Sequence, residues 1–153
     1  MKNQVFPKHQ SSFGEIDANV LALLVYLVPA VLSFLPNVGL LFTWFIPLMV
    51  YLFEKNSKFV KFHAAQSFVL NIVGTCINIL VTIIGILVLT GGILSNEAAD
   101  IIGGASIMMM INFAVNILVF IYAIFAMSGA YKNTQYQIPI IGKIAVKFSG
   151  IDE

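Results

Sequence analysis

The chain alternates long apolar runs with short polar segments. Each run ends at a polar segment or a turn signal, and together they fall in four stretches: residues 16–35, 40–53, 64–90 and 105–131. About 20 helical residues cross the hydrocarbon core of a bilayer, which is ~30 Å thick. The pattern predicts an all-α, polytopic membrane protein with four transmembrane helices, of which the second is short.

The polar segments predict where the helices begin and end. Ser12 and Glu15 have the spacing of a capping box before the first helix. Pro36-Asn37-Val38-Gly39 is a turn signal, and the glycine pairs at 91–92 and 103–104 suggest a loop over residues 91–104. This division gives a cytoplasmic N-terminal segment over 1–15, a transmembrane domain over 16–131 and a cytoplasmic tail over 132–153.

The tail carries a short amphipathic pattern over residues 139–148. Pro139 suits a first helical turn. Ile140, Ile141, Ile144 and Phe148 share a face, and Lys143 and Lys147 lie opposite. We expect a C-terminal interfacial amphipathic helix on the cytoplasmic leaflet, or one that docks under the helix bundle.

Composition supports the membrane interpretation. Hydrophobic residues make up 59% of the chain and charged residues 10%, whereas soluble domains carry about 25% charged residues. The single cysteine, Cys76, lies in an apolar run and reads as a small buried hydrophobe. No spacing of ligand residues predicts a metal or cofactor.

The lysines predict the topology. All eight basic residues are lysines, and four crossings place every one on the same side of the membrane. By the positive-inside rule that side is cytoplasmic, so both termini are expected there, in the cell membrane. Headgroup contacts are expected from four of these lysines: Lys58, Lys61, Lys143 and Lys147.

Apart from Asp17 at the start of the first one, the predicted spans contain polar residues but no charged ones, which argues against a proton-coupled transporter or a voltage sensor. The polar residues form stripes at helical spacing: Asn71, Asn78 and Thr82 on the third span, and Asn112 and Asn116 on the fourth. Asparagines can bond between helices. Two interpretations remain open, interhelical packing and a polar pathway lined by the four asparagines.

Prolines interrupt two of the predicted helices. Pro29 and Pro47 each lie within a span, and each removes one backbone donor and frees the carbonyl four residues earlier. A membrane helix tolerates such a carbonyl when a neighbouring hydroxyl satisfies it.

The boundary before the third span carries the densest polar chemistry. Phe59, His63 and Gln66 share a face, and Ser67 follows. This group is the candidate partner-binding or structural site. We expect His63 and Gln66 to contact the tail or the loop before the third span.

The residues from Ser57 to Ser67, Ser-Lys-Phe-Val-Lys-Phe-His-Ala-Ala-Gln-Ser, together with Glu54-Lys55 and the tail Tyr136-Gln137-Ile138-Pro139, resemble a family. It comprises small four-helix bacterial membrane proteins of unknown function, distantly similar to the 20-kDa channel-like component of chloroplast inner-envelope protein import. Members often carry arginine at Lys58 and Lys61 and an acidic residue at Lys143. The resemblance implies a four-helix bundle but no activity.

Three functions compete. The first is a non-enzymatic accessory or subunit of a membrane complex, resembling import or translocation components. The second is a small passive pore or facilitator lined by Asn71, Asn78, Asn112 and Asn116. The third is a membrane-integrity or stress factor. No catalytic constellation or nucleic-acid surface is recognisable, and the expected partners are the lipid bilayer and another membrane protein or a second copy.

Overall fold

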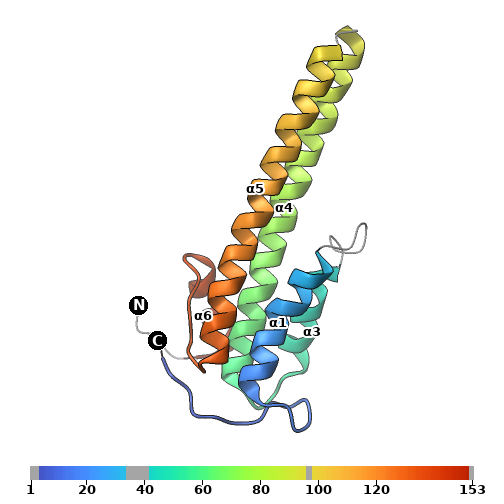
Figure 1. Cartoon of the computed structure of the whole chain (residues 1–153). Coiled ribbons are helices and arrows are strands. Elements are labelled where there is room, and N and C mark those ends of the chain that lie inside the picture. Colours follow the sequence, from blue (N-terminus) through green and yellow to red (C-terminus); the bar gives the residue numbers. More distant parts are fainter. Residues whose placement is uncertain (1–3, 34–41, 96–97, 152–153) are drawn as a thin grey trace. The chain divides into compact units, whose positions relative to one another are not determined.

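Helices form the regular structure of the chain. The computed structural model describes residues 4–33, 42–95 and 98–151, and in this part of the chain there are five helices and no strand. They are α1 (Ala18–Leu32), α3 (Phe45–Phe53), α4 (Lys58–Ser95), α5 (Ala98–Tyr131) and α6 (Ile141–Ser149), all shown in Figure 1. The predicted all-α class is confirmed.

The chain divides into two compact units. The first comprises residues 1–72 and 120–153, and the second comprises residues 73–119. The first unit contains α1, α3 and α6 with the beginning of α4 and the end of α5. The second is a hairpin made of the remainder of α4 and α5.

Small residues allow the helices of the first unit to pack closely. Ala18 and Ala22 of α1 are buried against Phe59 and Val60 of α4, and Ala130 of α5 belongs to the same cluster. Methyl-sized side chains let helix backbones approach each other, which is the usual packing mode of membrane helices. Helix α3 lies beside α1 (Figure 1).

A second cluster attaches α6 to the first unit. Ala145 and Val146 of α6 are buried against Phe62 and Ala65 of α4, together with Ile151. Gly150, with φ +65°, ends α6 in the left-handed conformation that glycine adopts without strain. Helix α6 therefore docks on α4, which is one of the two arrangements expected for the tail, and it begins two residues later than predicted.

Glycines line the seam of the hairpin in the second unit. A Cβ on Gly104 would lie 2.5 Å from Cγ1 of Val88, and one on Gly92 would lie 2.9 Å from Cγ1 of Ile101. Gly91 and Gly103 instead face open space. The prediction of a loop over 91–104 was therefore wrong, because α4 and α5 continue through both glycine pairs and use them for close helix approach.

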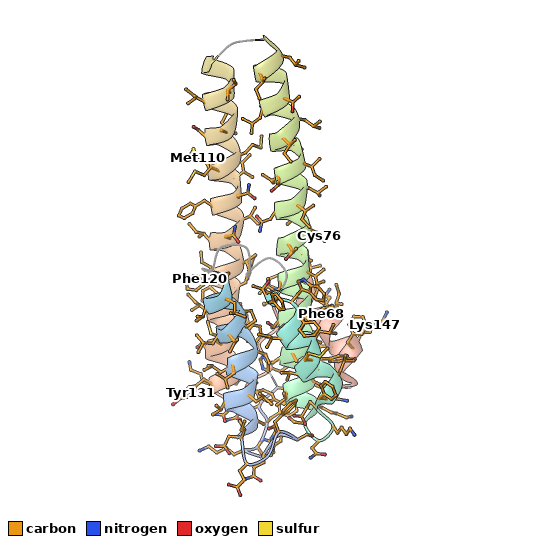
Figure 2. All side chains as sticks on the ribbon, turned by 90° about the vertical axis from the view of Figure 1, so that its right-hand side faces the viewer. Phe68, Cys76, Met110, Phe120, Tyr131 and Lys147 are labelled. Atoms are coloured by element: carbon orange, nitrogen blue, oxygen red, sulfur yellow. The ribbon has the colours of Figure 1, made fainter. Side chains whose placement is uncertain are left out.

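In the described part of the chain, two helices are long and apolar enough to cross a membrane. They cover Lys58–Leu94 and Ile101–Tyr131, and only 11% and 6% of their most apolar windows are buried within the protein. Their side chains project outward, Cys76 and Met110 among them (Figure 2). The prediction that Cys76 is buried was wrong for the chain by itself, since this thiol is exposed on α4.

The other predicted spans differ from the observed helices. Helix α1 has 15 residues and α3 has nine, against the roughly 20 that a full crossing needs. The predicted turn at Pro36 to Gly39, and parts of the spans 16–35 and 40–53, lie outside the described residues. Pro47 falls in the first turn of α3, where a proline removes no intrahelical bond, so it does not free a carbonyl as expected.

Candidate functional site

The beginning of α4 is fixed by a serine cap. Ser57 precedes the helix, and its Oγ accepts a hydrogen bond from the backbone N–H of Val60 at 3.1 Å. Its own hydroxyl lies 2.6 Å from Nε2 of His9, whose Nδ1 lies 2.8 Å from the carbonyl oxygen of Pro7. A carbonyl can only accept, so Nδ1 of His9 donates to Pro7. The N-terminal segment is thereby tied to the first turn of α4.

A fully buried carboxylate organises the turn between α3 and α4. Glu54 accepts hydrogen bonds from the hydroxyl of Ser12 at 2.7 Å and from the backbone N–H groups of Ser12, Asn56 and Ser57 at 2.9–3.1 Å. The Ser12 hydroxyl in turn accepts from the backbone N–H of Lys55 at 2.8 Å. Burial alone would raise the pKa of Glu54, but these donors outweigh it and hold that pKa below its usual range.

The capping box predicted at Ser12 and Glu15 was wrong. The hydroxyl of Ser12 donates to Glu54 instead. Helix α1 begins at Ala18 after Asp17, whose side chain makes no capping hydrogen bond. The backbone N–H of Ala18 instead donates to the carbonyl of His9 at 2.9 Å. A partner 42 residues away therefore replaces the local one.

Three buried side chains join α1, α4 and the tail. The hydroxyl oxygen of Tyr26 lies 3.1 Å from Nδ1 of His63. Nε2 of the same histidine lies 3.3 Å from the carbonyl oxygen of Thr134. Because that carbonyl must accept, Nε2 of His63 carries the proton and the Tyr26 hydroxyl donates to Nδ1. The Tyr26 oxygen also accepts from the Gln66 amide at 3.0 Å. The ring is a neutral histidine with both nitrogens bonded.

Gln66 completes the connection to the tail. Its amide nitrogen donates to the carbonyl of Tyr136 at 3.0 Å, and its amide oxygen accepts from the backbone N–H of Ile138 at 3.0 Å. A short extended piece of the tail is therefore held by side chains of α4. The expected contact of His63 and Gln66 with the tail is confirmed.

Ser67 compensates for the proline in α1. Pro29 has no N–H to donate to the carbonyl of Val25, four residues earlier. The hydroxyl of Ser67 donates to that carbonyl at 2.6 Å, and both groups are buried. The hydroxyl that a proline-containing membrane helix requires is thus supplied by α4.

Phe59 packs in the same region without a polar role. Its ring is buried, 4.6 Å between centroids from His63 at 71° and 5.2 Å from Phe6. An edge-to-face arrangement of this kind is favourable for aromatic pairs. Phe59 joins the N-terminal segment to the Tyr26–His63–Gln66 group.

The two terminal segments pair with each other. Val5 and Thr134 form an antiparallel bridge, bounded by backbone bonds from Phe6 to Asn133 and from Gln135 to Gln4, each 2.8 Å long. We call residues 4–17, 54–57 and 132–140 the cap. Residues 4–17 bond to 54–57 through His9 and Ser12, and they bond to 132–140 through the Val5–Thr134 bridge, so the three segments come together within the first unit.

The four lysines predicted to contact lipid headgroups lie in the first unit. Lys58, Lys143 and Lys147 are not buried, and Lys61 is half-buried. Their contact with lipid stays a prediction.

The asparagine stripes are mostly satisfied within their own helices. Asn71 donates to the carbonyl of Ser67 at 2.8 Å in the first unit. In the second unit Asn112 donates to Met108 at 3.1 Å, Asn116 to Asn112 at 2.7 Å, and the Thr82 hydroxyl to Asn78 at 2.8 Å. Of the predicted stripe, only Asn78 and Asn116 are bonded across the hairpin, at 3.5 Å.

The sequence also predicts that Asn78 and Asn112 are buried between the third and fourth spans, which is wrong for both side chains. Asn112 is half-buried, and it bonds its own helix instead of α4. Asn78 is also half-buried, and its partner is Asn116. A side chain that bonds the carbonyl four residues earlier needs no partner, so these stripes require neither a pathway nor extensive interhelical bonding.

Tyr26 and His9 were not singled out from the sequence, and Ser12, Glu54 and Ser57 were not assigned to this site. All five carry buried or part-buried bonds in it. Ser57 was recognisable, since it directly precedes the apolar helix and is a preferred N-cap residue. Among the described residues, no group of three or more His, Cys, Asp or Glu side chains is placed to hold a metal ion.

The chain is similar to known proteins over most of its length. Residues 17–145, more than half of its length, match the magnetosome magnetite crystal formation protein family. The chain belongs to this family. A UPF0132 membrane protein of Methanocaldococcus jannaschii is 33% identical over 142 residues, which cover 92% of this chain and 94% of that relative. No solved structure matches.

The family match covers the Tyr26–His63–Gln66 group and most of the tail that it holds. It confirms a family of small membrane proteins, as the sequence indicated, and the long apolar helices agree with it. The likeness to the chloroplast import component stays a prediction.

Proposed function

We propose that the protein is a non-enzymatic, multi-pass component of the cell membrane that serves as an accessory or subunit of a membrane complex, through the cap. The observation that carries this proposal is the contrast between the two units. In the first, buried polar residues from three parts of the chain fix the backbone of the cap. In the described part of the second, the predicted polar stripe bonds within its own helices or, for Asn78 and Asn116, across the hairpin, and large apolar side chains are exposed.

The proposed topology has four crossings with both termini in the cytoplasm. Two observations support it. The Val5–Thr134 bridge requires an even number of crossings between these residues, and all eight lysines lie in the segments that this topology leaves on one side. Helices α1 and α3 would then belong to the first two crossings.

Side-selective labelling tests this topology. Single cysteines at Asn37, Asn96 and Lys132, each in a Cys76→Ser background, are exposed to a membrane-impermeant maleimide. Four crossings predict labelling of the first two positions in intact cells and of Lys132→Cys only after permeabilisation. Labelling of Lys132→Cys in intact cells would reverse the orientation. Protection of Asn37→Cys alone would reduce the crossings to two.

A fixed cap suits docking better than catalysis, because its buried polar groups bond to one another and leave none free for a substrate. The proposed role resembles that of import and translocation components, as the sequence resemblance implies.

Native electrophoresis after mild detergent extraction tests the proposed role. We expect the wild-type protein to migrate with a stoichiometric partner, and a His63→Ala, Gln66→Ala variant to insert normally but to leave that complex. The matched control is Asn116→Leu in the second unit, which should keep the partner. An unpartnered wild-type protein that conducts solutes in vesicles would instead favour the pore, which the locally satisfied asparagines make the weaker candidate. An unpartnered protein without flux, whose deletion sensitises cells to membrane stress, would favour the stress factor.

A further inference from the structure

Helix α6 has two different apolar faces, and only one of them is used inside the protein. Gly142, Ala145, Val146 and Ser149 are buried where the helix packs on α4. Ile140, Ile144 and Phe148 form a row four residues apart, and they are 77%, 39% and 59% exposed. The large apolar side chains of this row therefore point away from the protein, and the smaller ones point into it.

The orientation of this row is fixed by the surrounding structure. The hydroxyl of Tyr51 donates to the carbonyl of Phe148 at 2.9 Å, which anchors the end of α6 to α3. At the other end, a Cβ on Gly142 would lie 2.6 Å from Cβ of Gln137, so the helix is seated closely on the preceding turn. The exposed row cannot turn inward without breaking these contacts.

A strained turn presents the first residue of the row. Ile140 has φ +67° and ψ −57°, and the backbone N–H of Ile141 donates to the carbonyl of Pro139 at 2.8 Å. These are the features of a γ-turn with positive φ, a rare conformation that β-branched residues avoid. Strained backbone of this kind concentrates at functional positions. Here it holds an exposed isoleucine at the edge of the molecule, where burial within the protein gives no reason for it.

Charge identifies what the row contacts. Lys143 and Lys147 are exposed on the flank of the row, and the helix Ile141–Ser149 contains no acidic residue. A row of large apolar side chains flanked by lysines fits the boundary between acyl chains and anionic headgroups. A protein partner would be expected to offer carboxylates to these lysines, whereas an anionic bilayer surface already supplies phosphates beside the chain's own membrane helices.

We propose that the exposed row Ile140–Ile144–Phe148 inserts into the headgroup and upper acyl region of an anionic bilayer, with Lys143 and Lys147 at the level of the phosphates. The proposal deepens the proposed placement of the cap at the cytoplasmic leaflet and rests on it. It assigns α6 two tasks: its small-residue face docks on α4, and its large-residue face holds the cap against the lipid.

Fluorescence quenching in vesicles tests the insertion. A Phe148→Trp variant in a Trp44→Phe background is reconstituted into phosphatidylcholine vesicles containing roughly one quarter phosphatidylglycerol, with or without bromine atoms on the acyl chains. The matched control is Val5→Trp in the same background, because Val5 is an exposed apolar residue of the cap outside α6. We expect bromination to reduce the emission of the Phe148→Trp variant about twofold and to leave that of the control within about a tenth.

Charge removal gives the second arm. A Lys143→Gln, Lys147→Gln change added to the Phe148→Trp variant should reduce the quenching at least by about half in the anionic vesicles. Equal emission of the Phe148→Trp variant in brominated and ordinary lipid would overturn the proposal. So would emission that depends on the protein-to-lipid ratio and not on bromination, since a second copy would then cover the row.

A spin label at a second position of the row tests the insertion without the tryptophan variant, in case that variant misfolds. A nitroxide at Ile144→Cys, in a Cys76→Ser background, should relax faster with oxygen than with a water-soluble nickel chelate, and the reverse order would contradict insertion. These measurements use purified protein. A wild-type protein that migrates without a partner in native electrophoresis would therefore refute the proposed function without changing them.

Discussion

Removing the Ser67 hydroxyl should destabilise the protein only as long as Pro29 is present. The hydroxyl donates at 2.6 Å to the Val25 carbonyl, which Pro29 leaves without its helical donor. A buried carbonyl without a partner costs about 1–3 kcal/mol in proteins generally. Bonds between membrane helices average about 0.6 kcal/mol and reach about 1.7 kcal/mol. Since this bond is short and both groups are buried, we expect Ser67→Ala to lose about 1–2 kcal/mol.

The same change should be nearly silent once the helical donor is restored. In a Pro29→Ala background, the backbone N–H at position 29 can donate to the Val25 carbonyl, and Ser67 becomes redundant. We expect Ser67→Ala to cost about 0.5 kcal/mol or less there, which gives a coupling of about 1 kcal/mol between the two positions. The cavity left by removing the proline ring cancels in the double-mutant cycle.

Unfolding by sodium dodecyl sulfate from dodecyl maltoside micelles measures these energies. The fluorescence of Trp44, the only tryptophan, reports on the first unit, where its ring lies 6.4 Å from that of Phe68. Ser33→Ala is the matched control, because its hydroxyl bonds an exposed carbonyl of its own helix. Equal losses for Ser67→Ala in the two backgrounds would refute the compensation between α4 and the proline.

Three further outcomes follow from the contacts described above. Glu54→Gln should lose about 2 kcal/mol at pH 7, because it weakens a buried, multiply bonded carboxylate. Folding lowers the pKa of Glu54, so its contribution to folding stability is present above the unfolded value near 4.5 and is lost as the pH falls through the lower folded value. The unfolding curves of the wild-type and Glu54→Gln proteins should therefore converge only below pH 4.5. A stability difference that stays constant as the pH falls further would contradict this role of the Glu54 carboxylate. Gly104→Val should weaken the hairpin by about 1–3 kcal/mol through overpacking against Val88, whereas Gly103→Val faces open space and should lose less than about 1 kcal/mol; equal losses would argue against the glycine seam. Asn116→Leu should cost about 0.6 kcal/mol in detergent unfolding, and a loss above about 2 kcal/mol would mean that the 3.5 Å contact is stronger than its geometry indicates.

The features that could be predicted from the sequence are those that depend on one segment at a time. Long apolar runs predict α4 and α5, since length and hydropathy are properties of the run itself. His63 and Gln66 were identified because polar residues at the end of an apolar helix need partners, and the tail lies on the same side. The need of Pro29 for an external hydroxyl followed from backbone chemistry alone, although its donor, Ser67, did not.

The features that could not be predicted depend on partners far apart in the chain. Ser12 has the spacing of a local cap, and nothing near it indicates that Glu54 competes for the hydroxyl. Gly92 and Gly104 read as loop residues because glycine is a poor helix former in isolation. Their neighbours across the hairpin decide otherwise, since a larger side chain would meet Ile101 or Val88.

The closure of the cap by the two terminal segments is the central claim, and a disulfide across it tests that claim most directly. Val5 and Thr134 are a bridged pair with backbone bonds on both sides and none between them, the arrangement in which opposite Cα atoms lie about 4.5 Å apart. Cysteines at such a pair are within disulfide reach. The test protein carries Val5→Cys and Thr134→Cys in a Cys76→Ser background and is kept in native membranes. Mild oxidation should join the two cysteines and protect nearly all of both thiols from modification by a maleimide polymer. Reduction should restore the modification. Either single variant, Val5→Cys or Thr134→Cys, should remain reactive after the same oxidation. Full reactivity of the 5–134 pair after oxidation would show that the ends do not meet and would contradict the account.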